Sequence, residues 1–209
     1  MLVFQGDSIT DVGRQRAGAA ESSAEALGRG YVLSVAGRLQ MDQPGAAVHN
    51  RGVSGNRVTD LRDRWAEDCL ALEPTVLSVL IGVNDTWHGT AKGTPELGTP
   101  LETFDRVYRE LLEETRSRLP AVRLVIGEPF VLACGAVLEM AFQPEMGQRA
   151  ELVRGIAADY ADVFVPYQSV FDAAAERAAP EYWAADGVHP SVAGHRLMAD
   201  AWWAAVTEA

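Results

Sequence analysis

The chain has 209 residues, of which 48% are hydrophobic and 22% charged, values typical of one globular domain spanning residues 1–209. Its formal net charge of −11 argues against nucleic acid and anionic membrane surfaces as partners, because both attract clusters of Lys and Arg. The two cysteines, Cys69 and Cys134, are too few for a disulfide framework, and no apolar run approaches the roughly 20 residues of a membrane-spanning helix.

Strand and helix patterns alternate along the chain. Short apolar runs predict strands at residues 2–5, 46–50, 75–81, 122–127 and 163–165. Apolar periodicity and helix stop signals predict helices at residues 31–41, 57–72, 101–119, 145–160, 169–178 and 190–207. Residues 12–28 and 86–100 are predicted loops, and residues 128–144 are apolar without a clear period. Five strands that alternate with helices indicate an α/β fold with a parallel sheet and helices on both faces.

The first strand leads directly into polar residues. Gly6 permits a tight turn, and four favourable helix N-cap residues follow it: Asp7, Ser8, Thr10 and Asp11. We therefore expect Ser8 at the carboxyl end of the strand, beside a helix N-terminus, where open α/β sheets bind their ligands. The Ser8 hydroxyl could act as a nucleophile at this edge, or Ser8 could serve only as a helix cap.

Three further polar clusters follow strand ends or precede the last helix. Residues 50–56 combine Asn and Ser with glycines, including Gly55, and could present backbone N–H groups or form an ordinary turn. Asn84 follows the third strand and carries an uncharged donor of the type that stabilises an oxyanion, although turn chemistry alone favours Asn there. Asp186 lies three residues before His189, so its carboxylate can reach the imidazole and fix the tautomer. Together with Ser8, these residues point to serine-based nucleophilic catalysis.

These motifs carry a family resemblance. Gly6-Asp7-Ser8, Gly55, Gly82-x-Asn84-Asp85 and Asp186-x-x-His189 resemble the four ordered blocks of the SGNH hydrolases, also called GDSL esterases. The order and spacing match across the whole chain. The residues around the blocks, in 4–14, 50–56 and 188–195, are most similar to those of bacterial acetyl xylan esterases of the carbohydrate-deacetylating branch. The resemblance implies a flavodoxin-like three-layer α/β/α sandwich with a five-stranded parallel sheet.

The resemblance also implies an esterase mechanism, and the residue types support the same roles. Ser8 is the expected nucleophile, His189 the general base and acid, and Asp186 the residue that orients the imidazole. The expected oxyanion hole consists of the Ser8 and Gly55 backbone N–H groups and the Asn84 side chain. No metal or cofactor is expected, since the four histidines have no metal-ligand spacing.

Further residues are candidates for contacts with substrate. Trp87 and Trp183 lie near catalytic motifs and could form a wall for a sugar ring or close an acyl pocket, or they could only fill the core. Asp7 is a third candidate for the substrate site. Asp11 and Arg14 could reach the cleft, or could anchor the loop by an ion pair.

There are three alternatives to the acetyl-sugar esterase, one among enzymes and two from other classes. A lysophospholipase or thioesterase would use the same catalytic residues on a longer acyl chain. A carbohydrate-binding protein without activity would have no need for Ser8 with Asp186 and His189. A nucleotide-binding domain is disfavoured, because neither a Gly-x-Gly-x-x-Gly turn nor a P-loop follows the first strand.

Two expectations concern assembly and location. Trp202 and Trp203 are adjacent on the last predicted helix and point about 100° apart, so one can face the core while the other is at least partly outward, which favours a homo-oligomer. The chain enters a predicted strand at once, without the charged and hydrophobic regions of a signal peptide. If this start is the natural one, the protein is expected to be cytoplasmic.

Overall fold

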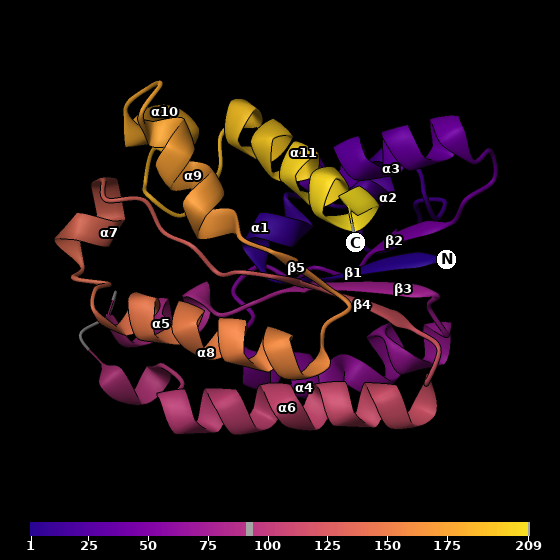
Figure 1. Ribbon diagram of the computed structural model, residues 1–209, viewed down its shortest axis with the longest axis horizontal. Coiled ribbons are helices and arrows are strands. Elements are labelled where there is room, and N and C mark those ends of the chain that lie inside the picture. Colours follow the sequence, from indigo (N-terminus) through magenta and orange to yellow (C-terminus); the bar gives the residue numbers. More distant parts are fainter. Residues whose placement is uncertain (91–93, 209) are drawn as a thin grey trace.

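A five-stranded parallel sheet crosses the molecule, with strand order β2-β1-β3-β4-β5 (Figure 1). The computed structural model describes residues 1–90 and 94–208, and its strands are β1 (Leu2–Gly6), β2 (Val48–Asn50), β3 (Val76–Leu80), β4 (Arg123–Gly127) and β5 (Val163–Val165). All five predicted strands are confirmed, and the strand order is that of the flavodoxin-like folds.

Helices cover both faces of the sheet, which confirms the three-layer α/β/α architecture (Figure 1). One face carries α1 (Ser8–Asp11), α2 (Ala24–Leu27), α3 (Tyr31–Asp42), α9 (Tyr167–Ala175), α10 (Pro180–Trp183) and α11 (Val192–Glu208). The other carries α4 (Val58–Asp68), α5 (Val83–Thr90), α6 (Leu101–Arg118) and α8 (Glu145–Tyr160), while α7 (Gly135–Glu139) lies near the carboxyl ends of the strands.

Alternating side chains of the strands build two separate cores. In β1, Val3 packs among the residues of α4 and α6, whereas Phe4 packs among those of α3 and α11. In β4, Leu124 packs in the same core as Val3, and Val125 packs in the same core as Phe4. Because the central strands β1, β3 and β4 are largely buried on both faces, their sequences are mostly apolar rather than alternating, as the pattern at residues 75–81 already indicated.

The strand order reverses direction at β1, since β2 lies on one side of β1 and β3 to β5 lie on the other. As a result, the chain leaves β1 toward one face of the sheet, at α1, and leaves β3 toward the other face, at α5 (Figure 1). Such a switch point opens a crevice at the carboxyl ends of neighbouring strands. The polar residues that follow β1, including Ser8, and those that follow β3, including Asn84, therefore meet at this edge.

Within the described residues, five helical segments were not predicted from the sequence. The predicted loop at residues 86–100 contains most of α5 and a 3₁₀ turn at Pro95–Leu97, and its residues 91–93 lie outside the described residues. The prediction failed because Gly and Thr are weak helix formers, whereas burial of the first turn stabilises α5. Helices α2, α7 and α10 are four or five residues long, too short for a periodic signal.

Candidate active site

The turn between β1 and α1 places Ser8 at the sheet edge. The Asp7 carboxylate caps α1 by accepting a hydrogen bond from the Ile9 N–H at 3.0 Å, so Ser8 becomes the first residue of the helix. Gly6 is required by packing, because a Cβ atom there would lie 2.4 Å from the Thr10 hydroxyl and 2.5 Å from the Leu80 carbonyl oxygen. The expected strand–turn–helix placement of Ser8 is therefore confirmed.

Ser8, His189 and Asp186 form one continuous hydrogen-bonded chain. The Ser8 Oγ lies 2.9 Å from His189 Nε2, and His189 Nδ1 lies 2.6 Å from Asp186 Oδ2. The other carboxylate oxygen of Asp186 accepts hydrogen bonds from the Val188 and His189 backbone N–H groups at 2.9 and 2.7 Å. Gly187 makes this tight turn possible, since its φ of +83° disfavours any side chain. The carboxylate is thus held against the imidazole by the backbone that lies between them.

The charges of the Asp186 carboxylate and the His189 imidazole stabilise each other. Burial opposes ionisation of Asp186, but the hydrogen bonds from His189 and from the two backbone N–H groups outweigh it and lower the pKa of Asp186 to about 2. The hydrogen bond to Asp186 raises the pKa of His189 above its ordinary value, although partial burial of the ring acts in the opposite direction. The ionised carboxylate therefore makes the imidazole a stronger base.

Asn84 and Gly55 lie on separate segments that contact each other. Asn84 is the second residue of α5, and its side-chain amide donates to the Asn56 carbonyl oxygen at 3.1 Å. One hydrogen of that amide is engaged in this bond, which leaves the second hydrogen for another acceptor. Gly55 adopts a φ of +83°, a backbone conformation that favours glycine. The structure thus brings the loop that contains Gly55 and the segment that contains Asn84 together beside Ser8.

A cavity of about 420 Å³ collects these residues. Its walls are formed by Ser8, Ser54, Gly55, Asn84, Trp87, His88 and His189. Trp87 lies beside the His189 imidazole, with 5.6 Å between the two ring centroids, and it packs edge-on against Phe142. His88 and Ser54 were not predicted from the sequence. Asn84, Trp87 and His88 follow an i, i+3, i+4 pattern on α5, but the sequence predicted a loop over residues 86–100 and so gave no helical face that would have identified His88.

Two of the predicted substrate contacts lie elsewhere. The Trp183 side chain is buried, and its indole N–H donates to the Ala174 carbonyl oxygen at 3.0 Å rather than reaching the cavity. Asp7 is only 1% exposed and is used as the helix cap described above. Of the three candidates, only Trp87 lines the cavity. Large aromatic residues near a catalytic motif in the sequence can therefore face the core instead of the site.

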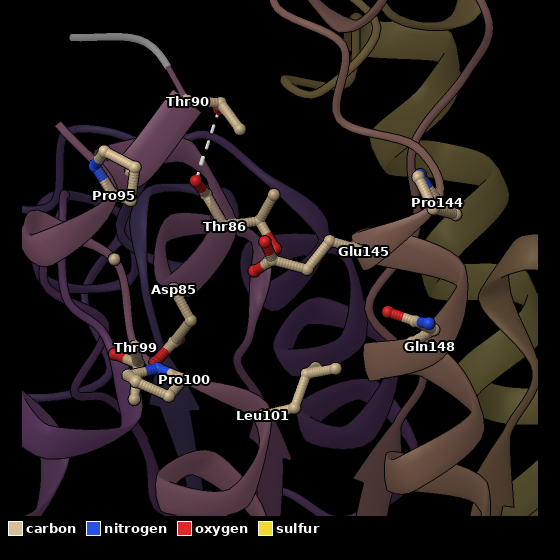
Figure 2. A pocket seen from close by; sticks show the side chains of 12 residues that line it. Asp85, Thr86, Thr90, Pro95, Thr99, Pro100, Leu101, Pro144, Glu145 and Gln148 are labelled. Carbon is tan, nitrogen blue, oxygen red and sulfur yellow. Dashed lines mark hydrogen bonds between the residues drawn. The ribbon is translucent and has the colours of Figure 1, made fainter. Parts of the chain in front are cut away.

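A second cavity of about 430 Å³ is lined by α5 residues that do not line the first cavity, and Figure 2 shows its lining. Asp85, Thr86 and Thr90 line it from α5, and Glu145 and Gln148 line it from α8. Asp85 is buried, and both of its carboxylate oxygens accept from the Val58 N–H at the start of α4. The helix that carries Asn84 thus separates two cavities and is fixed to α4 by the residue next to Asn84.

Comparison with known proteins agrees with this geometry. A sequence model of the GDSL-like lipase/acylhydrolase family matches residues 4–197, nearly the whole chain. The chain belongs to the GDSL-like lipase/acylhydrolase family. An acetylxylan esterase of Geobacillus stearothermophilus is 39% identical to this GDSL hydrolase over 204 residues, which cover 96% of this chain and 90% of that protein.

Solved structures of similar proteins have the same fold over nearly their whole length. A protein of Parabacteroides merdae described as a GDSL-like lipase has a TM-score of 0.92 and 42% identity, with 99% of this chain and 94% of that chain covered. The acetylxylan esterase Axe2 of G. stearothermophilus has a TM-score of 0.87 and 35% identity, with coverage of 98% and 93%. This GDSL hydrolase is therefore a carboxylic-ester hydrolase with the SGNH fold.

Two other features of the described residues bear on ligands. Within residues 1–90 and 94–208, no three His, Cys, Asp or Glu side chains are grouped so that they could hold a metal ion. In the same part of the chain, no helix is both long and apolar enough to cross a bilayer.

Proposed function

We propose that this GDSL hydrolase removes acetyl groups from acetylated xylo-oligosaccharides through a covalent acetyl intermediate on Ser8. The observation that carries the proposal is the Ser8–His189–Asp186 hydrogen-bonded chain at a cavity that Gly55 and Asn84 also line. A nucleophile bonded to a base, and a base bonded to an orienting carboxylate, is the arrangement that activates a serine.

In the acylation step, Ser8 Oγ attacks the acetyl carbonyl carbon, and its proton passes to His189 Nε2 at the other end of their 2.9 Å hydrogen bond. The imidazolium that forms is stabilised by the Asp186 carboxylate. When the tetrahedral intermediate collapses, the bond to the sugar oxygen breaks and His189 returns the proton to that oxygen. A water molecule then attacks the acetyl-Ser8 ester with His189 as base, which releases acetate and regenerates the free hydroxyl.

The negative charge that develops on the carbonyl oxygen in the tetrahedral intermediate requires hydrogen-bond donors. We assign these to the Ser8 and Gly55 backbone N–H groups and to the Asn84 amide hydrogen that is not bonded to Asn56. Such donors are fixed before the reaction begins, so they stabilise the developing charge without reorganisation. Removal of one of them typically raises the barrier by about 2.7–4 kcal/mol.

The acetyl-sugar substrate is supported by the cavity wall and by the relatives. The Trp87 ring stands beside His189, close to where the acyl group must lie, and we expect it to limit the room for a long chain. An indole face is also a suitable surface for a sugar ring. The Geobacillus relatives are named acetylxylan esterase and acetyl-xylooligosaccharide esterase. These observations favour a small acyl group on a carbohydrate over a lipid or thioester substrate.

The test is a panel of nitrophenyl esters from acetyl to decanoyl, together with acetylated xylo-oligosaccharides analysed by mass spectrometry. We expect kcat/KM to fall steeply from acetyl to butanoyl and acetate to be released from the sugars. Each methylene that fits an apolar pocket gains about 0.8 kcal/mol, so a lipase-like cleft would reward longer chains instead. Activity that rises out to octanoyl would replace this proposal with the lysophospholipase or thioesterase alternative.

The nucleophile is tested separately with the Ser8→Ala variant. This variant should lose esterase activity and labelling by a fluorophosphonate while its circular dichroism remains that of the wild type. Labelling of the wild-type enzyme at a different serine, located by peptide mass spectrometry, would refute the assignment of Ser8.

A further inference from the structure

The loop that carries Gly55 is held against α1 by side chains that the esterase mechanism does not use. Arg14 Nε donates to the Gly52 carbonyl oxygen at 2.8 Å, and Asn50 Nδ2 donates to the Thr10 carbonyl oxygen at 2.7 Å. A Cβ atom at Gly52 would lie 2.4 Å from the Asp11 backbone nitrogen, so the loop and the helix are in direct contact. The residues of α1 and the loop at residues 50–56 thus form one packed unit.

Asp11 makes the contact closest to Gly55. Its carboxylate oxygen Oδ2 accepts hydrogen bonds from the Ser54 backbone N–H at 2.9 Å and from the Ser54 hydroxyl at 3.2 Å. The same oxygen forms an ion pair with Arg16 at 2.8 Å, and Oδ1 accepts from the Arg14 backbone N–H at 3.2 Å. Asp11 is only 4% exposed, so water competes little for these bonds. Residue 54 is therefore fixed by an ionised, almost fully buried acceptor.

The residue after Gly55 is fixed as well. The Asn56 carbonyl oxygen accepts from the Asn84 amide at 3.1 Å, and Arg64 Nε donates to Asn56 Oδ1 at 2.7 Å. Gly55 itself has a φ of +83° and would have no atom within 4 Å of an added Cβ, so its own side of the turn provides no packing support. The direction of the Gly55 N–H thus depends on how its two neighbours are held.

We propose that Asp11 is a positioning residue for the oxyanion hole, because it fixes Ser54 and thereby aims the Gly55 N–H at the reacting oxygen. The inference rests on the proposed function, in which that N–H contacts the oxyanion. Asp11 itself is not one of the residues that line the cavity at Ser8. Hydrogen bonds from Arg16 and Ser54 outweigh the effect of burial and lower the pKa of Asp11, so the acceptor stays ionised at neutral pH.

The Asp11→Asn variant tests this role. Asn has one acceptor oxygen and one donor amide in place of two acceptor oxygens, so either the Ser54 N–H or the Arg14 N–H must face a donor. We expect kcat for nitrophenyl acetate to fall by about 10- to 100-fold, less than for a deleted oxyanion donor, because the Gly55 N–H is displaced but still present. KM should change by less than about threefold, since the donor acts on charge that develops in the transition state.

Two control variants separate positioning from general stability. Asp162 also accepts a backbone N–H, that of Leu124, and pairs with Arg116, but it precedes β5 at the opposite end of the sheet. Asp162→Asn should lower the melting temperature to a similar extent as Asp11→Asn and leave kcat within about twofold of wild type. Arg16→Ala removes the half-exposed ion-pair partner of Asp11 but keeps both Ser54 bonds, and it should also leave kcat within about twofold.

A transition-state mimic supplies a readout that stability alone does not move. Ser8 Oγ adds to the carbonyl carbon of 1,1,1-trifluoroacetone, the carbonyl electron pair moves to oxygen, and the serine proton passes to His189. The resulting hemiketal anion occupies the oxyanion hole. The inhibition constant of trifluoroacetone should rise in Asp11→Asn by the same factor as kcat falls. The inhibition constant of xylose, a competitive inhibitor that forms no oxyanion, should change by less than about threefold.

Two results would overturn the proposal. One is a folded Asp11→Asn enzyme with kcat within twofold of wild type, and the other is a loss of kcat with no change in inhibition by trifluoroacetone. If Asp11→Asn does not fold, Asp11→Glu keeps the charge and moves the acceptor by one methylene, and wild-type kcat in that variant would overturn the proposal equally. Failure of the esterase assignment is a different result, namely a Ser8→Ala variant that still hydrolyses the acetate ester.

Discussion

Asp7 offers a quantitative test of how the site is charged. Its carboxylate is 1% exposed and accepts one hydrogen bond, from the Ile9 N–H. Burial is the main cause that raises the pKa of Asp7 to about 7, and the nearby Asp85 carboxylate adds to the increase. The Ile9 N–H and the charge of His189 act in the opposite direction without cancelling it. An ionised Asp7 is therefore unfavourable in the folded protein.

The magnitude follows from the difference between the folded and unfolded pKa values. Below pH 3.8 the carboxyl is protonated in both states and contributes no penalty. Between pH 3.8 and about 7 the unfolded chain releases this proton and the folded protein keeps it, so the free energy of unfolding falls as the pH rises. At about 1.4 kcal/mol for each pKa unit, the full penalty above pH 7 is at most about 4 kcal/mol.

The Asp7→Asn variant should remove this pH dependence. Asn has a similar shape, can still accept the Ile9 N–H, and carries no charge to bury. We expect the variant to match or fall slightly below the wild type at pH 4 and to exceed it by about 2–4 kcal/mol in free energy of unfolding at pH 8. Urea unfolding followed by tryptophan fluorescence at pH 4, 6 and 8 measures the difference.

Asp63→Asn is the matched control, because the Asp63 side chain is 72% exposed and lies on the outer face of α4. This control should differ from wild type by less than about 0.5 kcal/mol at every pH. A difference between Asp7→Asn and wild type that is the same at pH 4 and pH 8 would refute the reasoning.

Four further outcomes are expected. Asn84→Ala should lower kcat for acetyl esters by about 10²–10³ with a smaller change in KM, and an effect confined to KM would exclude it from the oxyanion hole. Asp186→Asn should lower kcat by about 10⁴ and move the acid limb of the pH–rate profile to lower pH, because the hydrogen bond that raises the pKa of His189 is lost; an unshifted limb would contradict this. Trp87→Ala should flatten the fall in kcat/KM from acetyl to butanoyl esters, whereas an unchanged slope would show that another side chain sets the acyl size. Light scattering at micromolar concentration should show a homo-oligomer, and a monomer would contradict the prediction made from Trp202 and Trp203.

The assembly prediction illustrates what adjacent residues on a helix can and cannot specify. Trp202 is buried and its indole N–H donates to the Ser78 hydroxyl at 3.0 Å, as expected for the tryptophan that faces the sheet. Trp203 points to another side, where the Arg38 guanidinium lies 4.8 Å from the centre of its ring. The helical geometry correctly separated the two side chains, but whether Trp203 contacts a second subunit stays a prediction.

The sequence alone determined the order of the strands along the polypeptide and the residues of the Ser8–His189–Asp186 hydrogen-bonded chain. The short apolar runs are strong signals because buried parallel strands are apolar on both faces. The Asp186-x-x-His189 spacing is equally informative. Asp186 precedes His189 by three residues, and the turn at Gly187 brings Asp186 Oδ2 to 2.6 Å from His189 Nδ1 by local backbone geometry. Ser8 was predictable because a strand, a glycine and a run of cap residues specify a turn.

Only the tertiary structure decided which neighbouring side chains face the site. Helix α5 lies in a segment of weak helix formers and is stabilised by packing, so the i, i+3, i+4 face of Asn84, Trp87 and His88 was not visible in the sequence. Trp183 has the same proximity to a catalytic motif as Trp87, yet the direction of α10 turns its indole to the Ala174 carbonyl. Asp11 contacts Ser54 across 43 residues of chain. Contacts of this kind depend on how separate elements pack, and local propensity and spacing contain no information about that packing.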